Sequence, residues 1–196
     1  MTEVQNLGVQ LLRAYPTRTS WLRRVYKAPL YLWRMGFGFL IGRYIMVITT
    51  TGRKSGEPRH TMAEWHPLGG KRKFVPVNFG ERAQWYRNIA ADPHVTIQTS
   101  EGTEHVIARR VTDDAELLRV YHAIKALNPM MVQWYLDANG IQDTETDVLA
   151  KKDRVYMITF EPTDEPTPPP LSADLRWVWA IIGAALFLLA ARPRRR

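Results

Sequence analysis

Short segments rich in Val, Ile and Thr, each bounded by turn residues, dominate the middle of the chain. Segments of this kind are typical of β-strands. Around residues 84–91, 112–127 and 128–138 the apolar spacing changes to that of helices. About six short antiparallel strands, with helices inserted between the hairpins, predict an α+β fold built on a small β-barrel. The strands are predicted at residues 44–51, 59–67, 73–78, 95–99, 105–111 and 154–161.

Two of the predicted helices carry start signals. Thr112 is the predicted N-cap of the first, because three carboxylates follow it in the first turn, where they favour the helix dipole. Asn128 followed by Pro129 marks the start of the second.

The N-terminal region, residues 21–43, mixes aromatic and aliphatic residues with five basic ones at near-helical spacing. This combination is typical of a helix that lies in a membrane interface. An ordinary amphipathic helix that covers one end of the barrel is the alternative, and one helix can do both. Pro29, Gly36, Gly38 and Gly42 are expected to break this helix into pieces.

Residues 177–191 form a run without charge, flanked by Arg176 and by four arginines at the end of the chain. As a helix this run would be roughly 22 Å long, shorter than the ~30 Å hydrocarbon core of a bilayer. Snorkelling arginines and the interfacial Trp177 and Trp179 compensate, so we expect a membrane tail, with a buried core helix as the alternative. Four prolines between residues 166 and 170 predict a stiff linker before it.

Two sequence signals disagree about the side of the membrane on which the domain lies. The positive-inside rule would keep the terminal arginines in the cytoplasm and place the domain outside. Residues 1–10, however, have neither the basic start nor the apolar stretch of a signal peptide. We therefore expect a cytoplasmic domain whose tail is embedded without a clean span, with a tail that crosses against the rule as the alternative.

The charge is unevenly placed along the chain of 196 residues. Its net value of +8 at first suggests a nucleic-acid partner. Residues 1–56 carry +8, residues 57–174 carry −5 and residues 175–196 carry +5, and both basic ends are interleaved with aromatic residues, which favours a membrane and no nucleic acid. The absence of cysteine excludes Cys nucleophiles and iron–sulfur ligation. The expected organisation is an amphipathic segment (1–43), a barrel domain (44–161), a Pro-rich linker (162–174) and a hydrophobic tail (175–196).

The loop at residues 49–56, Thr-Thr-Thr-Gly-Arg-Lys-Ser-Gly, is the densest chemical signal. Two glycines let backbone N–H groups turn toward an anion, the hydroxyls add donors, and Arg53 and Lys54 supply charge, so the loop is predicted to bind a phosphate. It is not a Walker A loop, because the Gly-Lys-Ser order is absent. A plain hairpin loop with solvated Arg and Lys is an equally good interpretation.

A second signal begins with Val-Asn-Phe-Gly at residues 77–80 and continues with Gln-Trp-Tyr-Arg-Asn at 84–88. A strand that ends in Asn-Phe-Gly exposes its backbone at the barrel rim, and Trp85 and Tyr86 offer flat faces to a planar ring. Taken alone, Trp85 is more typical of a core residue.

Other reactive candidates are weaker. The five histidines show no metal-ligand spacing, so no metal site is expected. Ser55 lacks the G-x-S-x-G context of a hydrolase. Glu64 and His66 share one face of a strand and could act as acid and base, although a polar pair at the barrel mouth is the simpler interpretation.

Together these motifs resemble the deazaflavin (F420)-dependent nitroreductase family. The resemblance covers roughly residues 27–161 and rests on residues 46–59, Asn-Phe-Gly at 78–80, Trp-Tyr-Arg-Asn at 85–88 and Asp-Pro-His-Val-Thr-Ile-Gln at 92–98. It implies a split β-barrel related to the pyridoxamine-phosphate-oxidase group, with coenzyme F420 as cofactor. The implied activity is hydride transfer from the reduced deazaflavin, with an FMN-dependent reductase as the alternative.

The resemblance also implies roles for individual residues. The loop would grip the phosphate and oligoglutamate tail of the cofactor, and the second motif would line its deazaflavin ring. Tyr86 and Tyr135 are the implied proton donors, with solvent as the alternative. The implied cofactor-binding residues are Thr50, Thr51, Gly52, Arg53, Lys54, Ser55, Gly56, Arg59, Asn78, Phe79, Gly80, Trp85, Tyr86 and Asn88.

The implied substrate side includes Met131, Trp134 and Tyr135. Members that reduce nitroaromatics and quinones carry several tyrosines in this segment, so this chain departs from the nitroreductase pattern. An apolar pocket beside membrane lipids suits a lipophilic electron-poor acceptor such as a quinone, an unsaturated lipid or a nitroaromatic. A non-catalytic barrel that binds a cofactor, haem or lipid remains an alternative, and the protein is expected to be a monomer or a homodimer.

Overall fold

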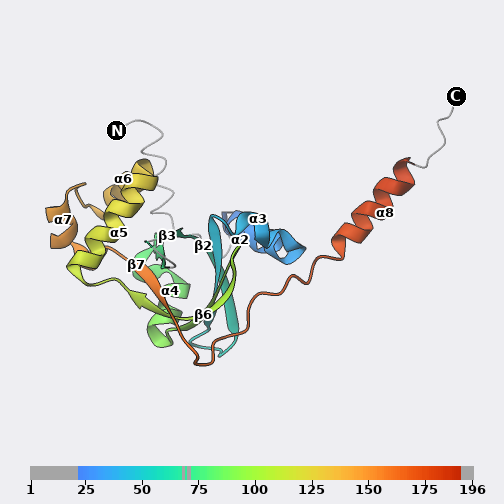
Figure 1. The fold of residues 1–196 in the computed structure, drawn as a ribbon, viewed down its shortest axis with the longest axis horizontal. Helices are drawn as coiled ribbons and strands as arrows, with labels where there is room; N and C mark the ends of the chain where they lie inside the picture. The colour runs from blue at the N-terminus through green and yellow to red at the C-terminus, as the bar shows by residue number, and fades with distance from the viewer. Residues whose placement is uncertain (1–21, 68, 70–71, 191–196) are drawn as a thin grey trace.

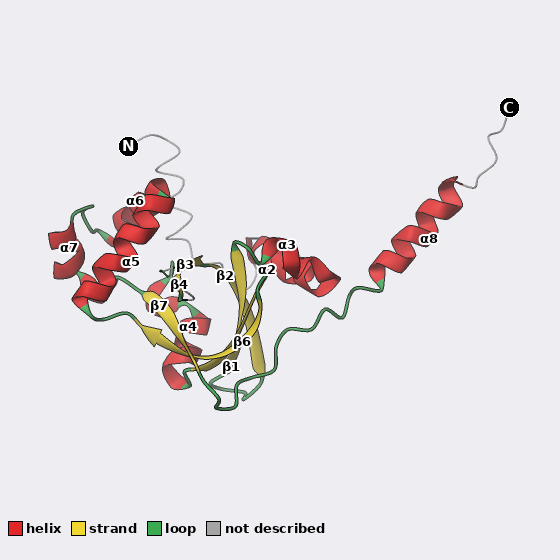
Figure 2. Ribbon diagram, in the orientation of Figure 1, coloured by secondary structure: helices red, strands yellow, loops and turns green. Residues whose placement is uncertain are grey.

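The fold is built on one antiparallel sheet of seven strands in the order β2-β1-β5-β6-β7-β4-β3 (Figure 1). The computed structural model describes residues 22–67, 69 and 72–190. The α+β class with an antiparallel sheet is confirmed, and helices lie on either side of the sheet (Figure 2). The strands are β1 (Ile45–Thr51), β2 (Pro58–Glu64), β3 (His66–Pro67), β4 (Lys73–Pro76), β5 (His94–Thr99), β6 (Gly102–Arg110) and β7 (Met157–Pro162).

Alternation along β5 separates a core face of the sheet from an outer face. Val95 and Ile97 are buried in a hydrophobic cluster inside the curved sheet. Because successive side chains of a strand point to opposite faces, Thr96 and Gln98 lie on the outer face. Ile97 pairs with Ile48 of β1, so the apolar positions of the two strands line up.

The sheet curls but is not closed, which corrects the expected barrel. Its edge strands β2 and β3 pair with β1 and β4, and no ladder joins them among the described residues. A single residue, Trp65, separates the two strands, so the chain passes directly from one edge to the other. The Trp65 backbone N–H continues the pairing with β1 by donating to the Tyr44 carbonyl, and its indole N–H donates to the Gly42 carbonyl, both at 3.1 Å.

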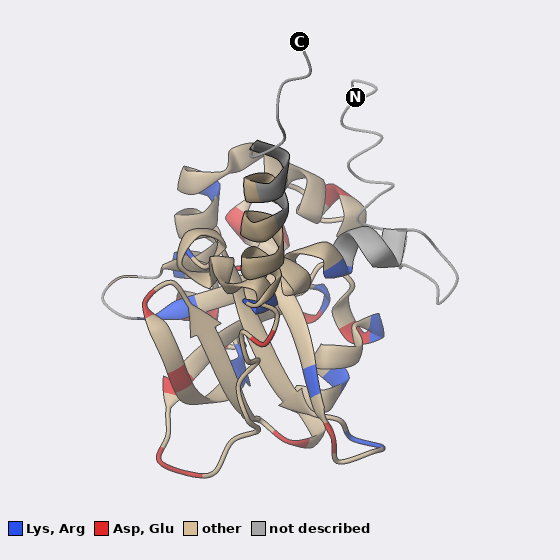
Figure 3. Ribbon diagram, turned by 90° about the vertical axis from the view of Figure 1, so that its right-hand side faces the viewer, with Lys and Arg blue, Asp and Glu red and all other residues tan. Residues whose placement is uncertain are grey.

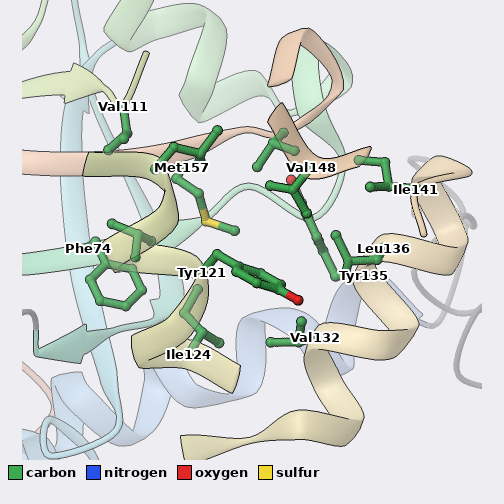
Figure 4. Packing of buried hydrophobic residues seen from close by; sticks show 13 residues of the cluster. Phe74, Val111, Tyr121, Ile124, Val132, Tyr135, Leu136, Ile141, Val148 and Met157 are labelled. Carbon is green, nitrogen blue, oxygen red and sulfur yellow. The ribbon is translucent and has the colours of Figure 1, made fainter. Parts of the chain in front are cut away.

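Buried side chains form two clusters. The first lies inside the sheet, beneath helix α4 (Gln84–Ala91), and includes Met46, Ile48, Val75, Val77, Ile89 and Ile158. The second lies between the sheet and helices α5 (Asp114–Leu127), α6 (Pro129–Asn139) and α7 (Glu145–Ala150) (Figure 4). Burial of these two apolar faces is what holds the helices on the sheet.

The helix boundaries correct some sequence predictions. The N-cap of α5 is Asp113 and not Thr112, because the Asp113 carboxylate accepts the backbone N–H of Glu116 at 2.8 Å. Asn128 is the N-cap of α6, as predicted, and accepts the Met131 N–H at 3.1 Å. Helix α7 and the 3₁₀ turn Lys152–Arg154 were not predicted, since a six-residue helix with one buried side chain shows no period. The last strand therefore begins at residue 157 and not at 154.

The N-terminal region forms α2 (Leu22–Leu32), the π-helical turn η1 (Trp33–Phe37) and α3 (Gly38–Ile41). The break lies at Gly36, whose φ of 96° leaves the helical region, whereas Pro29 is accommodated inside α2, against prediction. Gly42 ends α3 and lies against the turn after β5, where a Cβ would be 2.4 Å from the Ser100 nitrogen. Trp33 is buried, so the region covers part of the domain.

The Pro-rich segment after β7 is extended but is fixed along the outer face of β5. The Gln98 side chain makes two hydrogen bonds with the Leu171 backbone: its amide N–H donates to the carbonyl at 3.1 Å, and its oxygen accepts the backbone N–H at 2.8 Å. The Thr167 hydroxyl lies 2.6 Å from that of Thr96. We call residues 163–171 the strap, because these contacts hold the segment on the sheet and it is not a spacer that stands off from the domain.

Helix α8 (Val178–Ala190) follows the strap and extends away from the sheet (Figure 1). Among the described residues, no helix is both long enough and apolar enough to cross a membrane. The expectations for residues 1–10 and for the four terminal arginines lie outside the described residues. The division of the chain into four segments stays a prediction.

Candidate active site

The loop between β1 and β2 is a tight turn whose backbone N–H groups are used within it. The N–H groups of Ser55 and Gly56 donate to the Gly52 carbonyl at 3.0 and 2.8 Å, and the Gly52 N–H donates to the Glu57 carbonyl at 2.9 Å. A Cβ at Gly52 would lie 2.8 Å from the Ser55 hydroxyl and 3.0 Å from the Glu57 carbonyl oxygen, so a larger residue would crowd this turn. These three amides are therefore occupied within the turn, and the prediction that the loop binds an anion stays a prediction.

Side chains of the loop remain available to an anion. Arg53, Lys54 and Arg59 are all exposed. The Arg59 guanidinium donates to the Ser55 hydroxyl at 3.1 Å, which holds one cation beside the tip of the turn. A phosphate or carboxylate would be bound here by these side chains, as charge-assisted hydrogen bonds allow.

Asn88 of α4 joins this loop to the second motif, across 35 positions of sequence. Its oxygen accepts from the Arg53 guanidinium at 3.0 Å and its amide donates to the Thr50 hydroxyl at 3.0 Å. Gln84, one helical turn earlier, accepts a second bond from Arg53 at 2.9 Å. Because Asn88 and Thr50 are buried, they support the loop, and the contact with a ligand falls to the exposed side chains.

Within the second motif, we call the residues without Gln84 and Asn88 the ring motif: Asn78, Phe79, Gly80, Trp85 and Tyr86. The ring motif lies at the side of α4 that faces away from the loop. Asn78 is exposed at the end of β4, and Gly80 has a φ of 49°, a conformation that favours glycine. Tyr86 packs edge-on against Tyr156, with ring centroids 5.3 Å apart. Phe79 and Trp85 are partly buried against the first cluster, in line with the core character of Trp85.

Tyr156 is a site residue that sequence reasoning missed. A Cβ at Gly80 would lie 3.2 Å from its ring, and its backbone N–H donates to the Tyr135 hydroxyl at 2.9 Å. The Arg110 guanidinium lies 4.1 Å from the ring centroid, within the range of a cation–π contact. Burial and a hydrogen bond to Glu81 raise the pKa of Tyr156. The only signal in the sequence was a Tyr at an inward position of a predicted strand.

The two motifs therefore lie on opposite faces of α4. Gln84 and Asn88 are four residues apart and share the face toward the loop, while Tyr86 is about 200° from Gln84 around the helix. A ligand that contacts both motifs must extend past this helix. The arrangement suits a long molecule with an anionic tail and a planar ring at its two ends.

An apolar cavity lies between the sheet and helices α5 to α7, next to the ring motif. Asn78 and Pro76 line it on the sheet side, and Met131, Val132 and Tyr135 line it on α6. Figure 4 shows Tyr121, Tyr135, Met157 and Val148 converging on this region. Of the predicted substrate residues, Met131 and Tyr135 line the cavity, whereas Trp134 does not.

The two predicted proton donors differ in their surroundings. Tyr86 is half-buried beside Tyr156. Burial raises the pKa of Tyr135 to about 12, and its hydroxyl already accepts the Tyr156 N–H. Tyr135 is therefore a poor source of protons at neutral pH.

The alternative acid–base pair has little support from its geometry. The His66 ring nitrogen lies 3.5 Å from the Glu64 carboxylate, and the ring is stacked on Phe74 at 5.5 Å. Burial lowers the pKa of His66, so its neutral form is favoured. This matches the simpler interpretation, a polar pair at one edge of the sheet.

Comparison with known structures shows distant similarity. A solved F420-H2 dependent reductase is 22% identical, with a TM-score of 0.44 over 61% of this chain and 95% of that one. A putative pyridoxamine 5'-phosphate oxidase from Listeria innocua is 14% identical, with a TM-score of 0.43 over 64% of this chain and 89% of that one. A structure described as a domain-swapped dimer is 21% identical, with a TM-score of 0.46 over 74% of this chain and 100% of that one.

The sequence itself gives the family. Residues 32–140, more than half of the chain, match the profile of F420H(2)-dependent quinone reductases. The matched region contains the loop, the ring motif and all of α6. The resemblance to F420-dependent reductases, the enzyme class and the cofactor are thereby confirmed, while the narrower nitroreductase label is not supported. The chain belongs to the F420H(2)-dependent quinone reductase family and is an F420-dependent oxidoreductase.

Proposed function

We propose that the protein transfers a hydride from reduced F420 to a lipophilic, electron-poor acceptor, such as a quinone, an unsaturated lipid or a nitroaromatic. The observation that carries this proposal is the cavity beside the ring motif. Its lining is apolar except for Asn78 and two tyrosines, and its volume in this structure is about 20 Å³. Helices α5 and α6 would therefore move outward to admit an apolar acceptor, which would gain free energy by leaving water there.

The residues of the chain fit the cofactor at both ends. Exposed Arg53, Lys54 and Arg59 would hold its anionic tail, and Asn78 with the Gly80 backbone would border its ring. When bound, the deazaflavin supplies the hydride. The protein's own part is to orient ring and acceptor and to keep water out, because hydride transfer needs little acid–base chemistry from side chains.

We also propose that the protein is attached to the cytoplasmic face of a membrane. Large apolar side chains are exposed at both ends of the described chain, among them Phe39, Leu40, Ile181 and Phe187. Groups of exposed large apolar side chains are typical of interaction surfaces.

The test of the proposed reaction compares two neighbouring methionines on α6. Met131 lines the cavity, whereas Met130 is exposed and does not. Met131→Gln should raise KM for menaquinone about tenfold, because polar replacement removes apolar contact worth ~1.4 kcal/mol. Met130→Gln should leave KM unchanged, and F420 binding, followed by quenching of tryptophan fluorescence, should be equal in both.

Two outcomes would count against the proposal. If F420 quenches the fluorescence saturably but reduced F420 is not oxidised by menaquinone, by an unsaturated lipid or by a nitro compound, the chain is a binding protein. If both methionine variants change KM alike, the cavity is not where the acceptor binds.

A further inference from the structure

The two ends of the described chain are docked on each other. The Arg34 guanidinium of η1 donates to both carboxylate oxygens of Asp174, at 2.7 and 2.6 Å. The backbone N–H of Leu175 donates to the Arg34 carbonyl at 3.0 Å. The start of α8 is thus held on the N-terminal region by a bidentate ion pair and a main-chain bond, about 140 residues away along the sequence.

Aromatic contacts extend this docking. The Trp179 indole N–H donates to the Met35 carbonyl at 2.9 Å, and its ring packs edge-on against Phe37 with centroids 5.1 Å apart. A Cβ at Gly36 would lie 3.4 Å from the Arg176 side chain. The kink at Gly36 is therefore where the C-terminal segment fits, which gives the π-helical turn a structural reason.

The joined ends expose apolar groups on both components. Tyr31, Phe39 and Leu40 are more than half exposed on the N-terminal side. Trp177 is exposed just before α8, and α8 adds Ile181, Leu186 and Phe187. In Figure 3 the described part of α8 carries neither of the two colours for charged residues. We call these residues, with the segments 27–43 and 174–187 that carry them, the terminal surface.

The charge of the terminal surface is almost entirely positive. Lys27, Arg43 and Arg176 are exposed on it, and α8 carries no charge at all. Asp174 is the only acid in these two segments, and Arg34 neutralises it. Anionic headgroups would meet no opposing carboxylate here.

We propose that the terminal surface is one composite site for the surface of a bilayer with anionic headgroups, in which α8 enters a single leaflet and the basic residues contact the headgroups. The proposal deepens the membrane attachment proposed above and rests on it. Thirteen residues of helix span about 20 Å, against a hydrocarbon core of about 30 Å, so α8 does not cross. A bilayer is favoured over a protein partner because exposed apolar residues surround α8, whereas a protein partner covers one stripe.

The docking itself is tested by cross-linking, because the chain has no cysteine of its own. Arg34→Cys with Asp174→Cys should be joined within one chain by a short bis-maleimide, as seen by mass spectrometry. Phe37→Cys with Trp179→Cys should also be joined, and this double variant retains the ion pair between Arg34 and Asp174. Arg34→Cys with Arg119→Cys, on α5, is the control. If neither docked pair is joined in preference to the control, the ends are independent and the proposal is overturned.

Binding is tested with the full chain and vesicles of phosphatidylcholine with or without phosphatidylglycerol. Ile181→Asp with Phe187→Asp should lower the partition coefficient at least tenfold, since both side chains are exposed and leave water only in the bilayer. Arg43→Gln should lower it about fivefold on the anionic vesicles only. Arg119→Gln, which removes an exposed charge elsewhere, should change nothing.

Two results would overturn the lipid assignment. Equal partitioning of the Asp variant and the parent chain would show that α8 does not enter the bilayer. Lipid-free dimers that the same Asp substitutions dissociate would show that a second copy occupies the surface. F420 titration of the same samples keeps the tests apart, because loss of vesicle binding with F420 binding intact bears on the terminal surface alone.

Discussion

Replacing Asn88 by Ala should uncouple the loop from α4. The side chain is 5% exposed and bonds the Arg53 guanidinium at 3.0 Å, the Arg53 N–H at 3.4 Å and the Thr50 hydroxyl at 3.0 Å. A hydrogen bond to a charged group contributes about 1.5–3 kcal/mol and a neutral one about 0.5–1.5 kcal/mol. Because Arg53 is exposed, the lower part of each range applies, and we expect the free energy of unfolding to fall by about 2–3 kcal/mol.

The same change should weaken cofactor binding. Arg53 is held in position by Asn88 and Gln84, so its release should raise the Kd for F420 about tenfold, equivalent to 1.4 kcal/mol. Urea unfolding measures the first effect, and F420 titration by tryptophan fluorescence measures the second.

A matched substitution separates this role from the loss of any buried amide. Asn139→Ala removes one bond, from the amide to the Tyr135 carbonyl at 2.8 Å, at the end of α6. It should cost about 1 kcal/mol and leave F420 affinity unchanged. If Asn88→Ala and Asn139→Ala are alike in both measurements, Asn88 does not position the loop and the reasoning is refuted.

Three further predictions follow from other contacts. Lys54→Ala should raise the Kd for F420 about tenfold at low salt and less at high salt, because the exposed ammonium acts on the ligand alone. The free energy of unfolding should stay the same within about 0.5 kcal/mol. A Kd that changes with neither the substitution nor the salt concentration would contradict this. Hydrogen bonds from Arg109 hold the pKa of Glu116 below its usual 4.5, so the pair stabilises the fold above pH 4.5 and this contribution is lost as the pH falls through the lower folded value. Glu116→Gln should accordingly flatten the stability curve below pH 4.5 in urea unfolding at stepped pH, and an unchanged acid limb would count against the pair. Because its pKa is about 12, ionisation of Tyr135 should not affect kcat/KM up to pH ~11. An inflection of kcat/KM near pH 9 that Tyr135→Phe abolishes would refute this expectation. The same variant should lower the free energy of unfolding by about 1–3 kcal/mol, because the Tyr156 N–H loses its acceptor.

The sequence predicted the parts of the fold that have a period or a cap. The strand segments were located correctly, although several of their ends shift and the predicted strand at 59–67 is interrupted at Trp65. The start of α6 at Asn128 was correct, because capping is a local property. Closure of the barrel was wrong, since whether the two edge strands meet depends on the curvature of the whole sheet, which no local pattern encodes.

The candidate site was predictable as motifs but not as contacts. The loop and the ring motif were found, whereas their junction through Asn88 joins positions 35 apart and could be seen only in three dimensions. Tyr156 was missed for the same reason, since it lies directly before β7, far along the chain from Gly80, and meets Gly80 only in the folded structure. The internal bonds of the amides of Gly52, Ser55 and Gly56 could not be predicted, because a glycine permits several turns and this one closes on itself.

The single-residue passage at Trp65 limits how a ligand can reach the interior. One residue spans at most about 3.5 Å, so the two edges of the sheet are tethered and cannot swing apart to admit a molecule. Entry of an acceptor into the apolar cavity would instead use movements of α5 and α6, whose residues line it. The slow step of ligand release is thus expected in the helical layer, and the sheet acts as its fixed wall.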